Sequence, residues 1–229
     1  MFSILGGRLK LAKGPENYRP SEDSLWLAGL LPAPPSADKN ITICDAACGS
    51  GAVGLAYMAR HNLYGGLCGF DINKEMVSAA KKSAEANDIK TDYKTEDISN
   101  PPFEKNSFAL VCANPPFYKP AREMPTQNRK LAAVKFTAEP ITFWLERLTE
   151  LAAQDGYIGI IAHKNDELTL IKKGRELKSG CVKTFDLKSA ASKPVKRVVL
   201  IFKKGERPSA PASEVVCTYD TQTRKHFLT

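Results

Sequence analysis

The sequence Asn114-Pro115-Pro116-Phe117 is the most specific chemical feature of the chain, and it directly follows a strand-like stretch, 108–113. The prolines lack backbone donors and fix φ, so their carbonyl groups are rigid and can face a cleft. The Asn114 side-chain oxygen and the Pro115 carbonyl are two acceptors that match the two N–H bonds of a planar amino group. The Phe117 ring can stack on the same group. The pattern predicts a catalytic site for a planar nitrogen, with an ordinary rigid turn as the alternative.

A glycine-rich loop is the second candidate site. Gly49, Gly51 and Gly54 have GxGxxG spacing between a predicted strand and a predicted helix. Glycines at these positions allow a sharp turn and the close approach of a ligand. Asp71 ends the next predicted strand, 20 residues past Gly51, where a carboxylate can bind both ribose hydroxyls of a nucleoside. The loop and this acid together predict a nucleoside cofactor.

Asp45 stands at the end of the first predicted strand, just before the glycines, and it indicates which nucleoside is bound. A pyrophosphate next to this carboxylate would be repelled, whereas a cationic ligand would be attracted. S-adenosylmethionine carries both an ammonium and a sulfonium group. Asp45 therefore favours a methyl donor over a dinucleotide.

The segment Asp45-Ala-Ala-Cys-Gly-Ser-Gly51 resembles the first motif of class I S-adenosylmethionine-dependent methyltransferases, and Asp71 matches the acid after their second strand. The resemblance implies S-adenosylmethionine as the cofactor. It also implies that Asp97, within Glu96-Asp97-Ile98, hydrogen-bonds the adenine amine; a helix cap or a surface position is the alternative for this residue. The cofactor-binding residues implied in this way are Asp45, Cys48, Gly49, Gly51, Asp71, Ile72, Asp97 and Asn114.

The Asn-Pro-Pro-Phe sequence is similar to the signature of methyltransferases that act on planar nitrogens, namely adenine or guanine amines and the glutamine amide of release factors. The implied mechanism needs neither a metal nor a covalent intermediate. Asn114 and Pro115 hold the amine so that its electron density points at the methyl carbon, and they then accept the charge that develops. No general base is assigned, because the proton can leave to water. A base within folded RNA would be extruded and stacked on Phe117.

The first thirty residues indicate which subfamily of these methyltransferases the chain resembles. Leu5-Gly-Gly-Arg8-Leu and the segment from Asn17 to Ala28 look like the start of bacterial tRNA adenine methyltransferases that modify the adenosine following the anticodon of a valine tRNA. The segments 114–122 and 193–200 resemble the same family, which usually has glycine where this chain has Asn17. The likeness implies one domain, 1–229, in which residues 1–36 cover the cofactor site of a catalytic core, 37–229. Arg19 would then cover the methionine end of the donor, with a plain surface arginine as the alternative.

Other members of the class stay open as alternatives. Release-factor glutamine methyltransferases carry a helical recognition domain before the first motif, and many ribosomal guanine methyltransferases carry an extra upstream domain. Only about forty residues precede the motif here, which counts against both. DNA adenine methyltransferases need a sizeable recognition domain, which no segment supplies. A noncatalytic RNA-binding relative is the alternative outside enzymes, although such a module has no chemical use for all the site residues.

Strands that alternate with helices must position these residues. The pattern predicts an α/β fold with a doubly wound, mostly parallel sheet of seven strands, the last of them antiparallel. The predicted strands are 41–45, 67–71, 93–96, 108–113, 157–162, 182–187 and 198–202, with one more short strand possible at 214–219. The predicted helices are 53–62, 73–87 with Asn73 as its cap, 138–153 and 165–178.

Composition sets the wider limits. The chain has 229 residues, 43% of them hydrophobic and 25% charged, as in one globular domain. Six cysteines form neither CxxC pairs nor a Cys/His cluster, so neither a disulfide scaffold nor a metal site is expected. The start has no hydrophobic stretch of the signal-peptide kind, and no apolar run reaches the roughly 18 residues that span a bilayer. A cytoplasmic protein is expected.

The net charge of +8 is unevenly distributed. Residues 1–115 carry 12 basic and 13 acidic side chains, whereas residues 116–229 carry 21 and 12. A one-sided positive field suits a polyanion such as tRNA, with a solvated lysine surface as the alternative. The basic residues predicted to face RNA phosphates are Lys193, Lys196 and Arg197, together with Lys203 and Lys204.

Overall fold

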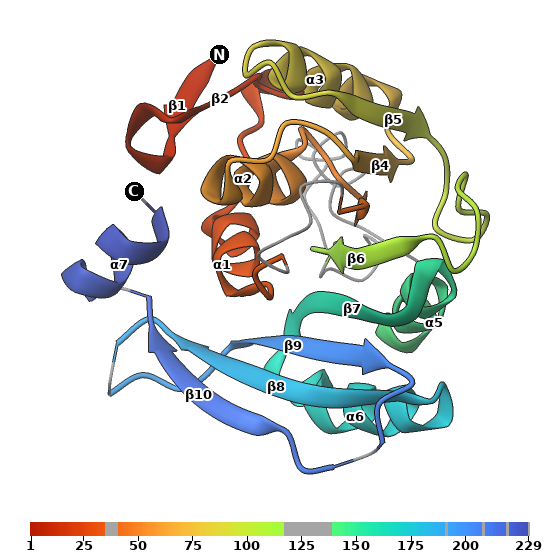
Figure 1. Cartoon of the computed structure of the whole chain (residues 1–229). Coiled ribbons are helices and arrows are strands. Elements are labelled where there is room, and N and C mark those ends of the chain that lie inside the picture. The colour runs from red at the N-terminus through yellow and green to blue at the C-terminus, as the bar shows by residue number, and fades with distance from the viewer. Residues whose placement is uncertain (35–40, 117–138, 191, 208, 219, 229) are drawn as a thin grey trace, which may run out of the picture.

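The computed structural model describes residues 1–34, 41–116, 139–190, 192–207, 209–218 and 220–228, and its centre is one eight-stranded sheet (Figure 1). The strands follow the order β10-β8-β9-β7-β6-β3-β4-β5 across the sheet. Their bounds are β3 Ile43–Ala46, β4 Leu67–Asp71, β5 Thr91–Thr95, β6 Phe108–Ala113, β7 Ala152–His163, β8 Ser179–Lys188, β9 Arg197–Lys204 and β10 Ala212–Cys217. The predicted α/β class with a doubly wound, mostly parallel sheet is confirmed.

The far edge of the sheet differs from the prediction. The strand β9 is antiparallel to both of its neighbours, β7 and β8, as expected for 198–202. The sheet nevertheless has eight strands rather than seven, because β10 pairs with β8 along six residues, from Ala212↔Lys183 to Cys217↔Lys188. This pairing is parallel, so the antiparallel strand is not the last one. The added strand satisfies the hydrogen-bonding edge that β8 would otherwise expose.

Alternating side chains of the sheet build two cores. Along β6, Leu110 and Cys112 face a core made with the helices α1 (Glu22–Leu30), α2 (Ala52–His61) and α3 (Lys74–Glu85). Val111 and Ala113 face the opposite core, made with α5 (Ile141–Leu151) and α6 (Glu167–Glu176). The strand period of two explains this division, since successive side chains point to opposite faces. Asn73 caps α3 as predicted, because its Oδ1 accepts the backbone N–H groups of Glu75 and Met76.

The N-terminal segment packs against the rest of the molecule through a small hairpin and α1. The hairpin pairs β1 (Phe2–Ile4) with β2 (Leu9–Leu11) around the short helix η1 (Leu5–Gly7), and it lies beside α3 (Figure 1). The Ala12 backbone N–H donates to Ser83 Oγ of α3 at 2.9 Å. The helix α1 follows the one-turn helix η2 (Pro15–Asn17) and packs on α2 and on the C-terminal helix α7 (Thr221–Leu228).

Three further observations concern the residues that the structure describes. Within the described residues, no helix is both long and apolar enough to cross a bilayer. The same part of the chain contains no group of three or more His, Cys, Asp or Glu side chains placed to hold a metal ion. All six cysteines are free.

Candidate active site at the carboxyl edge of the sheet

The predicted site residues meet where three neighbouring strands end. The strands β6, β3 and β4 are adjacent and parallel, and Ala46 is in register with Ala113 on one side and with Phe70 on the other. Asn114, the loop after β3 and Asp71 therefore emerge from the same edge of the sheet. The carboxyl edge is where open α/β sheets bind ligands.

The loop after β3 is a tight turn in which glycine is required. Its residues Ala47, Gly49 and Gly51 all have positive φ, of 54°, 53° and 84°. A Cβ atom on Gly51 would lie 2.8 Å from Leu55 Cδ1 and 2.8 Å from the Tyr93 hydroxyl oxygen. Leu55 and Tyr93 are both buried, so glycine is needed at position 51 because of its positive φ and because the interior leaves no room for a side chain.

Asp71 ties this loop to the end of β4. Its Oδ2 accepts the Gly49 backbone N–H and its Oδ1 accepts that of Asn73, both at 2.9 Å. Burial raises the pKa of the Asp71 carboxyl, and these two hydrogen bonds oppose the rise. Because each carboxylate oxygen has a second lone pair, Asp71 can still accept ribose hydroxyls. The neighbouring side chain of Ile72 is 65% exposed, which is unusual for a large apolar residue.

Asp45 lies beneath the loop and not in contact with solvent. The residue is fully buried, and its Oδ2 accepts the Gly54 backbone N–H in the first turn of α2 at 2.9 Å. Its Oδ1 is 3.9 Å from Cys112 Sγ. Burial raises the pKa of Asp45 to about 7, a rise to which the charge of Asp71 adds and which the Gly54 hydrogen bond opposes. Any attraction for a cationic ligand therefore acts through space and not through an exposed oxygen.

The side chain of Asn114 has one end held and one end free. Its Nδ2 donates to Ser24 Oγ at 2.9 Å. Its Oδ1 is buried and has no hydrogen-bond partner among the described residues. The next residue, Pro115, is buried, whereas Phe117, the predicted stacking platform, lies outside the described residues. A buried amide oxygen without a partner is an unsatisfied acceptor, and a ligand with an N–H or O–H group can bind to it.

Three other predicted cofactor residues have local partners. Cys48 is buried, and its backbone N–H donates to the Phe70 carbonyl at 3.0 Å. Asp97 Oδ1 accepts the Ser99 backbone N–H at 2.8 Å within a turn, so this side chain does not cap a helix. The Arg19 guanidinium lies over the Phe2 ring, 4.9 Å from its centre. This contact joins Arg19 to the N-terminal hairpin, and its cofactor role stays a prediction, as does that of Asp97.

The predicted basic face is divided between two edges of the sheet. Lys193 and Lys196 are exposed in the loop between β8 and β9, at the carboxyl edge. Arg197 is also at this edge, but its Nη1 is 2.7 Å from His163 Nδ1 and its Nε is 3.4 Å from Asp23 Oδ2. This guanidinium is therefore part of a side-chain network and is not a free phosphate ligand.

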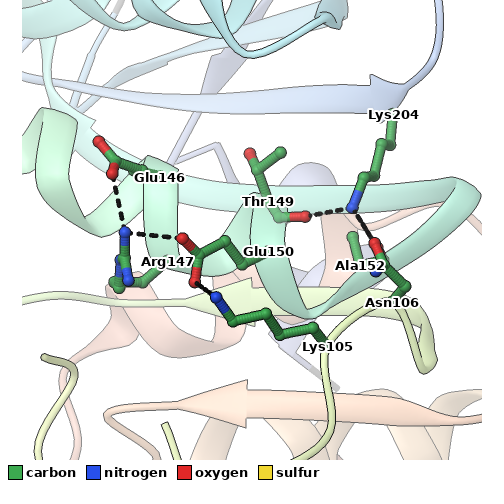
Figure 2. Close-up of polar contacts among 8 residues, drawn as sticks. All are labelled: Lys105, Asn106, Glu146, Arg147, Thr149, Glu150, Ala152 and Lys204. Atoms are coloured by element: carbon green, nitrogen blue, oxygen red, sulfur yellow. Dashed lines mark hydrogen bonds and ion pairs between the residues drawn. The ribbon is translucent and has the colours of Figure 1, made fainter. Parts of the chain in front are cut away.

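Lys203 and Lys204 lie at the opposite edge, because β9 is antiparallel and its eight residues span roughly 23 Å. Figure 2 shows the Lys204 ammonium at the end of α5, beside the ion pairs that Arg147 makes. Lys204 Nζ donates to Asn106 Oδ1 at 2.6 Å and to the Thr149 and Ala152 carbonyls at 2.8 Å. All three ammonium donors are thus used. Lys204 is therefore not a free phosphate ligand, and Lys203 lies at the edge opposite Lys193, so the prediction that Lys203 faces RNA phosphates stays a prediction.

Sequence reasoning assigned no role to several side chains that the structure brings to the site. Ser24 contacts Asn114, and its neighbour Asp23 pairs with Arg197. The Tyr18 phenol has a raised pKa, mainly because of burial and also because Asp71 and Asp23 are close. All of these residues come from the N-terminal segment. No local pattern could reveal them, since each contacts a strand end far along the chain.

The sheet and its helices have the Rossmann-like fold of methyltransferases, and this fold together with the matching family model supports S-adenosylmethionine as the cofactor. Residues 43–134 match the family model described as a methyltransferase domain. The residues fit the cofactor, since Asp71 supplies acceptors for a ribose and Ile72 is exposed beside it.

The comparison with curated proteins finds the tRNA1(Val) (adenine(37)-N6)-methyltransferase of Photobacterium profundum, 26% identical over 117 residues. The match covers 51% of this chain and 48% of that protein, so it spans about half the length of the relative.

Two solved structures are similar in fold. A Listeria monocytogenes protein assigned to the class I methyltransferases has a TM-score of 0.65 at 16% identity, over 90% of this chain and 68% of that one. The 16S rRNA N2 G1207 methyltransferase of T. Thermophilus, in complex with AdoMet and guanosine, has a TM-score of 0.59 at 17% identity, over 89% and 49%.

Proposed function

We propose that this protein transfers a methyl group from S-adenosylmethionine to the exocyclic amine of an adenine in tRNA, next to the anticodon. The observation that carries the proposal is the Asn114 side-chain oxygen, buried and unpartnered among the described residues at the edge that also holds Asp71. A planar amino group has the donors that this oxygen lacks. The curated relative supports adenine in tRNA as the target.

The chain's own residues would position the amine and stabilise the transition state. The bound cofactor supplies an electrophilic methyl group. Asn114 Oδ1 and the Pro115 carbonyl would accept the two N–H bonds of the amine, so that its lone pair is directed at the methyl carbon. As the nitrogen gains positive charge, the same two acceptors bind it more strongly, which lowers the barrier. The proton leaves to water after transfer, and no side chain is needed as a general base.

Exposed lysines at the same edge support a nucleic-acid substrate. Lys193 and Lys196 are exposed on the loop that precedes β9, within the half of the chain that carries the excess of positive charge. Phosphate contacts of this kind position a nucleic acid without reading its sequence. Phe117 remains the proposed stacking platform for an extruded base.

The test combines methyl transfer with nucleoside analysis. Labelled S-adenosylmethionine and unmodified tRNA are incubated with the wild-type protein, and nucleoside mass spectrometry is run on tRNA from cells with and without it. We expect N6-methyladenosine that depends on the protein. Label in a guanosine of ribosomal RNA or in a protein glutamine would show that tRNA adenine is not the substrate. If no label is transferred to any of these acceptors, the proposal that the protein is a methyltransferase is wrong.

The Asn114→Ala variant tests the site itself. Turnover should fall a hundredfold or more, on the order of the 2.7–4 kcal/mol lost with one preorganised polar group. Affinity for the methyl donor should stay close to that of the wild type, because the adenosine-binding residues are unchanged. Single-turnover transfer and calorimetry measure the two quantities. A variant with nearly normal turnover would show that Asn-Pro-Pro-Phe is only a structural turn.

A further inference from the structure

We propose that Ser24 is a positioning residue for the methyl transfer, because it holds the Asn114 amide with its oxygen toward the target amine. The inference rests on the proposed function and extends it to the N-terminal segment. Ser24 Oγ is 2.9 Å from Asn114 Nδ2, across 90 residues of sequence. Ser24 is 6% exposed, so this contact is sheltered from water.

An asparagine needs such a partner to work in this reaction. The two ends of its amide have nearly the same shape but opposite hydrogen-bonding character, since the oxygen accepts and the nitrogen donates. A target amine brings N–H donors, so only the oxygen end can bind it. Because a serine hydroxyl both accepts and donates, the contact fixes the position and plane of the amide, and in the observed arrangement it leaves Oδ1 without a partner among the described residues. Ser24 therefore holds the Asn114 amide in place while its oxygen is left for the target amine.

The helix α1 is held firmly enough for this purpose. Trp26 and Leu27 anchor it in the core, at 2% and 0% exposure. Its first turn is also fixed by two ion pairs. Asp23 Oδ2 lies 3.4 Å from Arg197 Nε at the start of β9, and Glu22 binds the Arg224 guanidinium of α7 with both oxygens, at 2.6 and 3.0 Å.

Ser24 thus stands on a turn that spans the ends of β6 and β9. The third strand at this edge joins the arrangement through His163, the last residue of β7, whose ring contacts Arg197. The first turn of α1 is consequently part of the site and not merely a cover over it. A serine at a fixed position in this turn can orient a side chain that belongs to β6.

The experiment compares Ser24→Ala with two other variants. Ser24→Thr keeps the hydroxyl, and Ser21→Ala makes the same change at the N-cap of the same helix, where the side chain makes no capping hydrogen bond. Loss of the hydrogen bond in Ser24→Ala should slow single-turnover transfer roughly tenfold. KM for the donor and the unfolding midpoint should change little. Ser24→Thr should recover most of the rate, and Ser21→Ala should match the wild type.

A double variant separates positioning from general support. In an Asn114→Ala background, Ser24→Ala should slow transfer no further, since the amide on which it acts is gone. Equal rates for Ser24→Ala and the wild type would overturn the inference. So would a further tenfold loss in the double variant, because Ser24 would then act independently of Asn114.

A spectroscopic measurement keeps the result separate from the identity of the substrate. In a ¹H–¹⁵N spectrum, the side-chain NH₂ pair of Asn114 is assigned by its loss in Asn114→Ala. We expect this pair to shift in Ser24→Ala and to stay in place in Ser21→Ala. An unmoved pair would overturn the inference whatever the substrate. Absence of transfer to RNA by the wild type would overturn the proposed function, and a shifted pair would still support the Ser24 contact.

Discussion

The two acidic residues of the cofactor site differ in how their oxygens are used. Asp71 lies at a strand end, where it holds two backbone N–H groups and keeps lone pairs for a ligand. Asp45 is one strand away and fully enclosed, so its pKa rises to about 7. At the residue scale, we propose that Asp71 binds the cofactor directly and that Asp45 acts only through its charge.

Asp71→Ala should weaken binding of S-adenosylmethionine about ten- to a hundredfold, since hydrogen bonds to a charged group contribute roughly 1.5–3 kcal/mol. Calorimetry measures the affinity, and a thermal melt checks that the fold is kept. Asp92→Ala is the matched control, because Asp92 is exposed on β5 and pairs only with Lys94. If Asp71→Ala and the control bind S-adenosylmethionine with equal affinity, Asp71 does not contact the cofactor.

Asp45→Asn should change stability with a definite pH dependence. The raised pKa means that the folded state holds the proton more tightly than the unfolded state. In the wild type, the contribution of Asp45 to the free energy of unfolding therefore falls as pH rises from about 4 to about 7, by a few kcal/mol. Asparagine can still accept from Gly54 but does not ionise, so this fall should be absent from the variant.

Urea denaturation of both proteins between pH 4 and pH 8 measures this difference, which should be largest at the upper end. The variant should also bind the cationic donor more weakly at pH 8, because the charge is gone. Parallel stability curves for the two proteins would show that Asp45 is ionised throughout that range in the folded state as well.

At the scale of elements, the connection from α5 to β7 depends on one lysine. The helix ends at Leu151 and the strand begins at Ala152, with no loop between them. Such an abrupt end leaves helix carbonyls without intrahelical partners. Lys204, from the neighbouring β9, donates to two backbone carbonyls there (Figure 2). The lysine thereby completes a helix end by bridging from another strand.

Lys204→Met should lower the free energy of unfolding by about 1–3 kcal/mol, because two partly buried carbonyls lose a charged donor. Lys203→Met is the matched control on the same strand, since Lys203 makes a partly exposed ion pair with Glu206 that is worth roughly 0–1 kcal/mol. Chemical denaturation measures both. An equal decrease in the free energy of unfolding in the two variants would mean that the hydrogen bonds of Lys204 add no stability beyond that of an exposed ion pair.

The elements themselves could largely be predicted from the sequence, whereas their contacts could not. The strands at 41–45, 67–71 and 108–113 were readable because short apolar runs end at an aspartate or are followed by asparagine. The β1–β2 hairpin was missed, since its strands have three residues each and depend on contacts with α3. Likewise, the Ser24 contact with Asn114 joins two segments with no shared local pattern.

At the scale of the whole molecule, the distribution of charge follows from the direction of one strand. The sequence shows Lys193, Lys196, Lys203 and Lys204 close together, but an antiparallel β9 carries the first two to the edge with Asn114 and the last two away from it. The antiparallel direction was expected for this strand, but the sequence positions of the lysines did not show that the length of the strand separates its two ends. Only part of the basic excess can therefore meet a substrate at the site.

Reversing the charges of Lys193 and Lys196 to Glu should flatten the salt dependence of tRNA binding, lowering its logarithmic slope by about 1 to 2, since each phosphate contact adds roughly 0.7–0.9. Lys172→Glu with Lys178→Glu is the control, because both lysines are exposed and Lys178 lies next to Gly205, beyond the far end of β9. Binding measured across a salt series should separate the pairs. If the salt dependence has the same slope for both pairs of variants, Lys193 and Lys196 do not contact RNA phosphates and are only part of the solvated surface.

The ion pairs of α1 also have a consequence for when the protein becomes active. The partners of Asp23 and Glu22 are Arg197 and Arg224, which follow them by 174 and 202 residues. A ribosome makes the chain from the N-terminus at about 5–20 residues per second. The glycine loop and Asn114 therefore leave the ribosome many seconds before both partners exist. The growing chain has the cofactor motif long before the first turn of α1 can be locked in place, so we expect full activity only after Arg224 has been made.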